Sequence, residues 1–268
     1  MPDRVIDLGG VAHIDVPGLD ALRIRKIRPV DLREALLEGW YDFRAMPSHL
    51  VVLTLIYPIL GLIAARWSMG NDLLPIIFPL ISGFALVGPL AAVGLYEISR
   101  RREAGLQTHW SNVFQVVRSP GALTILALGA VLLVLFVGWL LAATAIYRSQ
   151  FGAHVPASAV DMLRAIVSTR AGWTVILLGN AVGFVFAVVT LAVAAISFPL
   201  ALDRGVGPIV AIIASVRAMA ANPGTMLTWG AIVVALLVVG AIPLFVGLAV
   251  ALPVLGHATW HLYRRVVV

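Results

Sequence analysis

Long apolar runs alternate along this chain with shorter segments in which apolar residues recur at helical spacing. The apolar runs lie near residues 50–65, 74–95, 122–146, 173–202 and 226–255. They reach or approach the roughly 20 residues that a helix needs to cross the hydrocarbon core of a bilayer. Backbone groups in lipid find no water to bond, so such runs must form helices. The pattern predicts an all-α fold, a polytopic transmembrane helical bundle.

The last apolar tract is too long for one comfortable crossing. It extends from Thr225 to Tyr263, and Gly240-Ala241-Ile242-Pro243 interrupts it near its middle. We therefore divide it into two spans, which brings the total to about six. The predicted spans cover residues 48–66, 74–97, 121–147, 172–202, 224–241 and 243–263.

Amphipathic segments precede or separate the spans, so the repeated unit is an interfacial helix, a turn and a membrane span. The turn is clearest at Asn222-Pro223-Gly224 and recurs at Ser119-Pro120-Gly121. Such helices lie among the lipid headgroups, with apolar side chains towards lipid and charges towards water. The interfacial helices are predicted at residues 31–46, 106–117, 158–167 and 208–221.

The starts of two of these helices can be predicted. Asp31 is a plausible N-cap for the first, and Ser158 with Asp161 has the spacing of a capping box at the start of the third. Apolar residues of the first helix recur at helical spacing and form the face that we expect to lie in the interface. They are Leu32, Leu36, Trp40 and Phe43.

The first 47 residues are polar and precede the membrane part. Residues 22–29 alternate basic and apolar side chains. This pattern suits an extended, strand-like arm on the surface or a flexible basic tail that helps to fix membrane orientation; binding of lipid headgroups or of a partner is a further alternative. We divide the chain into a cytoplasmic basic arm with an interfacial helix, 1–47, and a six-helix transmembrane domain, 48–268.

Composition agrees with a membrane protein, because 61% of the residues are hydrophobic and 12% are charged. The chain contains no cysteine, which excludes disulfides, thiolate metal sites and cysteine catalysis. Its net charge of +6 fits anionic headgroups and membrane orientation better than nucleic acid, which we do not expect as a partner.

The basic residues are distributed asymmetrically about the predicted spans. Of the 19 Lys and Arg residues, all but Arg66, Arg148, Arg164 and Arg170 fall on the side that holds the N-terminus when there are six spans. The positive-inside rule then places both termini of this multi-pass protein in the cytoplasm. With five spans, Arg264 and Arg265 would lie outside.

His257 and His261 are one helical turn apart and share a face. Two imidazoles at this spacing can hold a metal or contact a haem. A closed site requires ligands from other helices too, so an interfacial or hydrogen-bonding role is favoured and no cofactor is expected. Trp260 and Tyr263 suit an aromatic belt at the headgroup level, and Arg264 is a further candidate for ligand or partner binding.

Two polar features lie at or within the spans. Glu97 ends the second span before the charged run that contains Arg101, and we expect Glu97 to pair with an arginine there. Asn180 lies in the middle of the fourth span, where a hydrogen bond between helices is favoured over ligand binding. It lies within Gly179-Asn180-Ala181-Val182-Gly183, a GxxxG spacing that lets membrane helices approach closely.

No nucleotide-binding loop, HExxH or GxSxG sequence is present. The spans contain almost no charge, which disfavours a proton-coupled pump or a steep ion pathway. The sequence therefore favours a protein that is not an enzyme.

Three segments carry a resemblance to a known family: Gly94-Leu95-Tyr96-Glu97-Ile98-Ser99-Arg100-Arg101, Ser215-Val216-Arg217-Ala218 with Asn222-Pro223-Gly224, and the segment from Gly256 to Arg264. Through them the chain resembles an uncharacterised family of bacterial, mainly proteobacterial, integral membrane proteins, a domain of unknown function. It is more distantly similar to the non-catalytic membrane domain of glycerophosphodiester phosphodiesterases. The resemblance implies a polytopic inner-membrane architecture and supplies no catalytic residues.

Three hypotheses for the function follow. The first is an accessory or scaffold protein that contacts membrane lipid, a protein partner or further copies of itself. The second is a permease for a small, weakly polar solute, with Asn180 in its path. The third is a haem- or metal-linked membrane protein that uses His257 and His261.

Overall fold

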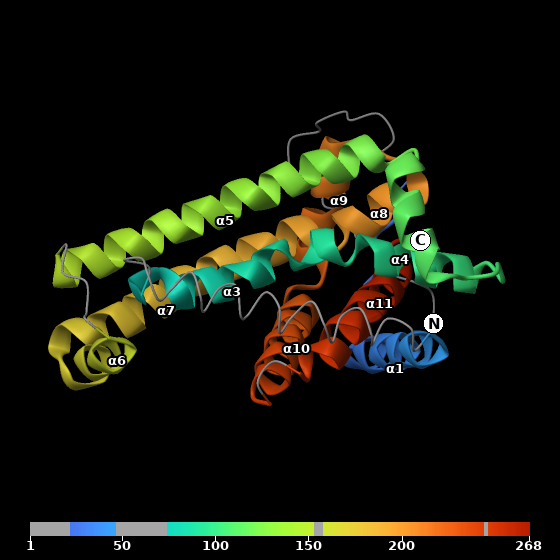
Figure 1. The fold of residues 1–268 in the computed structure, drawn as a ribbon. Helices are drawn as coiled ribbons and strands as arrows, with labels where there is room; N and C mark the ends of the chain where they lie inside the picture. The colour runs from blue at the N-terminus through green and yellow to red at the C-terminus, as the bar shows by residue number, and fades with distance from the viewer. Residues whose placement is uncertain (1–21, 47–73, 153–157, 244–245) are drawn as a thin grey trace. The chain divides into compact units, whose positions relative to one another are not determined.

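The computed structural model describes residues 22–46, 74–152, 158–243 and 246–268 (Figure 1). These residues belong to two compact units. The first comprises the N-terminal residues with Pro89–Gly129 and Leu191–Val268, and the second comprises the described parts of Pro58–Gly88 and Ala130–Thr190.

The described residues are almost entirely helical. The elements are α1 (Pro29–Ala45), α3 (Leu74–Ala91), α4 (Val93–Glu103), the 3-10 helix η1 (Trp110–Arg118), α5 (Ala122–Phe151), α6 (Ala159–Ser168), α7 (Arg170–Ala194), α8 (Ser197–Arg204), α9 (Pro208–Ala221), α10 (Pro223–Ala241) and α11 (Leu248–Val266). The all-α prediction is therefore confirmed for this part of the chain.

Four helical stretches among the described residues are long and apolar enough to cross a membrane: Ile77–Glu103, Ala122–Phe151, Arg170–Arg204 and Pro223–Ala241. They correspond to four of the predicted spans. The span predicted at 48–66 lies outside the described residues. The tract after Thr225 does divide into two helices, α10 and α11, but α11 is not among the four stretches. Among the described residues the structure thus supports four spans, and the total of six stays a prediction.

In the first unit, α1 packs against α11. The two helices approach most closely at Gly39, where an added Cβ would lie 2.6 Å from the backbone nitrogen of Ala258. Leu32 and Phe43, which were predicted to face the bilayer, are buried inside this unit. That prediction was wrong for both residues, because helical spacing reveals an apolar face without revealing whether protein or lipid covers it.

The N-terminus of α1 also differs from the prediction. Arg28 occupies the N-cap position and Pro29 the first helical position, where a missing N–H costs nothing. Asp31 stands three residues inside the cap, and its Oδ2 accepts the backbone N–H of Arg28 at 2.7 Å. Asp31 therefore stabilises the helix start from within the first turn instead of being the N-cap.

Residues 22–28 form an extended arm, as the strand-like alternative predicted. The arm pairs with the end of α11: the backbone N–H of Arg25 donates to Val266 O at 2.8 Å, and that of Val268 donates to Arg23 O at 3.0 Å. Asn222, between α9 and α10, accepts the N–H of Ile27 at 2.8 Å and donates its amide to Arg25 O at 3.1 Å. The turn that recurs in the sequence therefore holds this arm in place.

The second unit has a small apolar core formed by Leu86, Trp139 and Ala143. The Trp139 indole donates to Pro79 O at 2.9 Å. Gly183 lies against this indole, whereas an added Cβ at Gly179 would meet nothing within 4 Å. Only one glycine of the GxxxG spacing therefore brings two described helices together.

Helices are present where interfacial helices were predicted around 158–167 and 208–221, as α6 and α9. Ser158 is the N-cap of α6, and its hydroxyl accepts the backbone N–H of Asp161 at 3.1 Å, as predicted. The helix predicted at 106–117 is a 3-10 helix, η1. An added Cβ at Gly94 of α4 would meet Val113 of η1, while Val117 is exposed.

Candidate functional site

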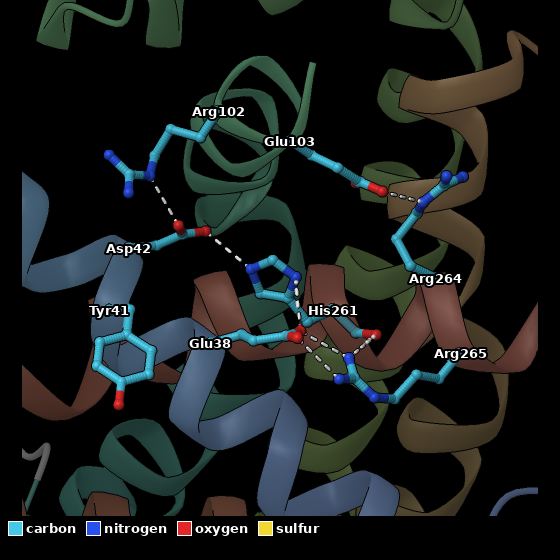
Figure 2. A pocket seen from close by; sticks show the side chains of 8 residues that line it. All are labelled: Glu38, Tyr41, Asp42, Arg102, Glu103, His261, Arg264 and Arg265. Carbon is cyan, nitrogen blue, oxygen red and sulfur yellow. Dashed lines mark hydrogen bonds and ion pairs between the residues drawn. The ribbon is translucent and has the colours of Figure 1, made fainter. Parts of the chain in front are cut away.

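Polar side chains gather where α1, the end of α4 and the C-terminal half of α11 meet (Figure 2). Two of the segments that carry the resemblance, 94–101 and 256–264, come together here. The third contains Asn222, which holds the N-terminal arm. Residues that are far apart in the sequence thus form one cluster within the first unit.

Asp42 of α1 is the centre of this cluster and is only 6% exposed. Its Oδ2 accepts the hydroxyl of Ser99 at 2.6 Å and Nε2 of His261 at 2.8 Å. Its Oδ1 accepts Nε of Arg102 at 2.7 Å. A single carboxylate therefore ties α1 to both α4 and α11.

Ser99 and His257 extend this network into the interior, where both are fully buried. Ser99 donates its only proton to Asp42, so at its 2.8 Å contact with Nδ1 of His257 the imidazole is the donor. A catalytic serine requires the opposite direction, in which the imidazole accepts the serine proton. The trio of Ser99, His257 and Asp42 therefore acts as a structural clamp rather than as an activated nucleophile.

His261 lies between two carboxylates of α1. Its Nε2 contacts Asp42, and its Nδ1 lies 3.2 Å from Oε2 of Glu38. Glu38 also accepts two hydrogen bonds from the guanidinium of Arg265, at 2.7 and 2.9 Å.

The remaining polar residues of α11 bind the ends of α4 and α8. Glu103 accepts the Trp260 indole at 2.9 Å and Nε of Arg264 at 2.9 Å. The hydroxyl of Tyr263 donates to Asp203 at 2.6 Å. Trp260 and Tyr263 are buried in protein, so the predicted aromatic belt at these two positions was wrong.

An open cleft of about 490 Å³ lies over the cluster. Its walls hold three arginines, three carboxylates, one histidine and one tyrosine, so the formal charges of the arginines and carboxylates balance. The lining residues, all shown in Figure 2, are Glu38, Tyr41, Asp42, Arg102, Glu103, His261, Arg264 and Arg265.

The cluster shifts the pKa values of its own acids. Burial alone would raise the pKa of the Asp42 carboxyl, but hydrogen bonds from His261, Ser99 and Arg102 outweigh it and lower that pKa to about 2. The hydrogen bond and the charge of Arg265 lower the pKa of Glu38. Burial and the hydrogen bond to Asp203 raise the pKa of the Tyr263 hydroxyl. At neutral pH the carboxylates are thus charged and act as acceptors.

Three ring nitrogens of His257 and His261 contact other side chains of the protein. Nδ1 of His257 contacts Ser99, and both nitrogens of His261 contact carboxylates. Ligation of a haem or metal needs a free imidazole nitrogen, so ligation through any of these three nitrogens would first require its contact to break. Within the part of the chain that the structure describes, no group of three histidine, aspartate or glutamate side chains is arranged to hold a metal ion.

The other predicted site residues lie outside the cleft. Glu97 is buried and accepts two hydrogen bonds from Arg100, at 2.7 and 2.9 Å, so it pairs with an arginine as expected. Arg101 binds the carbonyl oxygen of Gln107. The amide of Asn180 donates to Ile176 O in its own helix at 2.7 Å and is exposed. This bond replaces the predicted hydrogen bond between helices.

Of the cluster, sequence reasoning found His257, His261 and Arg264 and missed their partners. The missed residues are Glu38, Asp42, Ser99, Arg102, Glu103 and Arg265. One signal was present: the four carboxylates of α1 recur at helical spacing on one face of the helix, while the end of α11 is rich in histidine and arginine. Complementary charge on two helices indicates that they can pair.

The long apolar helices, with a polar network at the ends of two of them, are those of a multi-pass integral membrane protein. A family model described as "Predicted integral membrane protein (DUF2189)" matches residues 77–203. The match confirms the resemblance to a family of membrane proteins of unknown function over a little under half of the chain. No curated protein and no solved structure matches the chain significantly. The more distant similarity to the phosphodiesterase membrane domain stays a prediction.

Proposed function

We propose that this chain is a multi-pass protein of the bacterial inner membrane that acts through contacts with lipid or with another membrane protein, in an accessory or scaffold role. It carries out no catalytic step of its own. The observation that supports this proposal most directly is that the polar side chains best suited to chemistry bind one another. Ser99, Asp42 and His261 connect α1, α4 and α11, which is a structural use of these groups.

The orientation that we propose has both termini in the cytoplasm. Residues 22–28 pair with the end of α11, so the first and last described segments share one side. The same cluster binds Arg102 and Asp203, next to the last residues of the stretches Ile77–Glu103 and Arg170–Arg204. The excess of Lys and Arg in these segments favours the cytoplasmic side.

Native mass spectrometry of the protein, released from native nanodiscs or a mild detergent, tests this proposal. The expected result is a retained lipid or protein partner in defined stoichiometry, with no absorbance in the visible range. A visible chromophore would instead support the haem hypothesis. A bare monomer in both preparations would contradict the proposal and make transport assays the next experiment.

A further inference from the structure

The outward face of α1 carries a stripe of apolar and basic side chains that differs from the apolar face predicted from the sequence. It consists of Val30, Arg33, Leu37, Trp40, Tyr41 and Arg44. These residues recur at helical spacing and lie on the sides of α1 turned away from Gly39, which contacts α11; Tyr41 also borders the cleft. The four apolar members are between 39% and 61% exposed. The stripe has no covering element among the described residues.

The charge of this stripe is positive. Arg33 and Arg44 are exposed, and neither forms an ion pair or a hydrogen bond with a described residue. The carboxylates of α1 are occupied elsewhere: Asp31 contacts Arg25, Glu34 and Glu38 contact Arg265, and Asp42 contacts Arg102. Two unneutralised guanidiniums therefore flank an aromatic patch.

The position of α1 points to the membrane as the surface that this stripe meets. Asp42 binds Arg102, the residue before the end of the stretch Ile77–Glu103. Through α11, α1 is also linked to Asp203, at the end of the stretch Arg170–Arg204. A helix held at the polar ends of two membrane-spanning stretches lies at the level of the headgroups. Exposed tryptophan and tyrosine with arginine are typical of helices in that layer.

We propose that the stripe formed by Val30, Arg33, Leu37, Trp40, Tyr41 and Arg44 docks on the anionic phospholipid headgroups of the membrane that the chain spans. Arg33 and Arg44 bind lipid phosphates as charge-assisted donors, while Leu37 and Trp40 enter the boundary between headgroups and acyl chains. This inference rests on the proposed function and names the lipid surface as the partner of one helix.

The absence of cysteine allows a clean test. A single cysteine introduced as Leu37→Cys is labelled with an environment-sensitive fluorophore, and the protein is placed in nanodiscs of phosphatidylcholine alone or with phosphatidylglycerol. With the anionic lipid, the emission should shift to the blue and be quenched by nitroxide lipids labelled near the headgroup. High salt should reverse the shift, since screening weakens surface electrostatics.

Variants of the arginines test the charge. In the Leu37→Cys background, Arg33→Gln with Arg44→Gln should lower the ratio of docked to undocked helix by roughly 5-fold per arginine. Arg33→Lys with Arg44→Lys should retain docking. The matched control is Arg118→Gln, which removes an exposed charge from η1 and should leave the signal unchanged. None of these side chains bonds a described residue, so the thermal unfolding midpoint should stay the same.

Two outcomes would overturn the inference. One is an emission that is the same in both lipids and insensitive to the nitroxide lipids. The other is a fluorophore shielded from water and lipid alike, which would mean that a protein covers the stripe. In either case a lipid or protein retained in native mass spectrometry would leave the proposed function standing. Conversely, a bare monomer would remove the proposed function even if α1 docks on lipid.

Discussion

The most informative single change is Asp42→Asn. The Asp42 carboxyl has a pKa of about 2 in the folded protein, against an ordinary value of 3.8. A shift of that size corresponds to about 2 kcal/mol of stabilisation of the folded state at neutral pH. Asparagine keeps the shape but loses the charge, so Arg102 and His261 would face a neutral amide. We therefore expect a loss of at least about 2 kcal/mol, since breaking a buried pair costs more than the pair contributes.

The sign of the pH dependence follows from the direction of the shift. The folded pKa of Asp42 lies below its unfolded value, so this carboxylate stabilises the folded state above about pH 4. The stabilisation is lost as the pH falls from about 4 towards 2. The wild-type protein should show this loss, and the contribution of Asp42 to it should be absent from Asp42→Asn.

Thermal unfolding in detergent, followed by circular dichroism, measures both effects. A loss of 2 kcal/mol should lower the midpoint by roughly 4–8 °C for a protein of this size. The matched control is Glu34→Gln on the same helix, whose half-exposed carboxylate lies 3.5 Å from Arg265 and contributes at most about 1 kcal/mol. If Asp42→Asn unfolded at the wild-type temperature, or kept the same acid transition, the assignment of Asp42 as the centre of the cluster would be refuted.

Two further predictions concern the backbone of the first unit. Gly39→Ala should destabilise the protein by about 1–3 kcal/mol, because its Cβ would overlap Ala258 of α11. The control is Gly179→Ala, whose added Cβ would meet no neighbouring residue within 4 Å. It should leave the unfolding midpoint the same or slightly higher. Asn222→Ala should release the N-terminal arm by removing its bonds to Ile27 and Arg25, and faster tryptic cleavage within 23–28 would report this. An unchanged cleavage rate would show that Asn222 does not hold the arm.

Local features of the fold were predictable from the sequence, and contacts between distant residues were not. The N-cap at Ser158 could be predicted from a four-residue capping pattern, and the long helices could be predicted from the long apolar runs. Asp42 could not be identified in this way, because Ser99 is 57 positions from it and His261 is 219 positions from it. The amphipathic spacing of α1 also did not show whether protein or lipid covers its apolar face. Leu32 is covered by protein, whereas Trp40 on the same predicted face is 40% exposed.

The pairing of the carboxylates of α1 with α11 has a consequence for biosynthesis. α1 leaves the ribosome early, but Arg265 and His261 of α11, which contact Glu38 and Asp42, are translated much later. At about 5–20 residues per second, the helix waits for tens of seconds before α11 arrives. During that interval the carboxylates facing α11 remain hydrated, which keeps the face of α1 from inserting prematurely into the bilayer. The cluster thereby makes completion of the first unit depend on α11, so a chain that stalls before α11 exposes an acidic, unfinished surface to quality control.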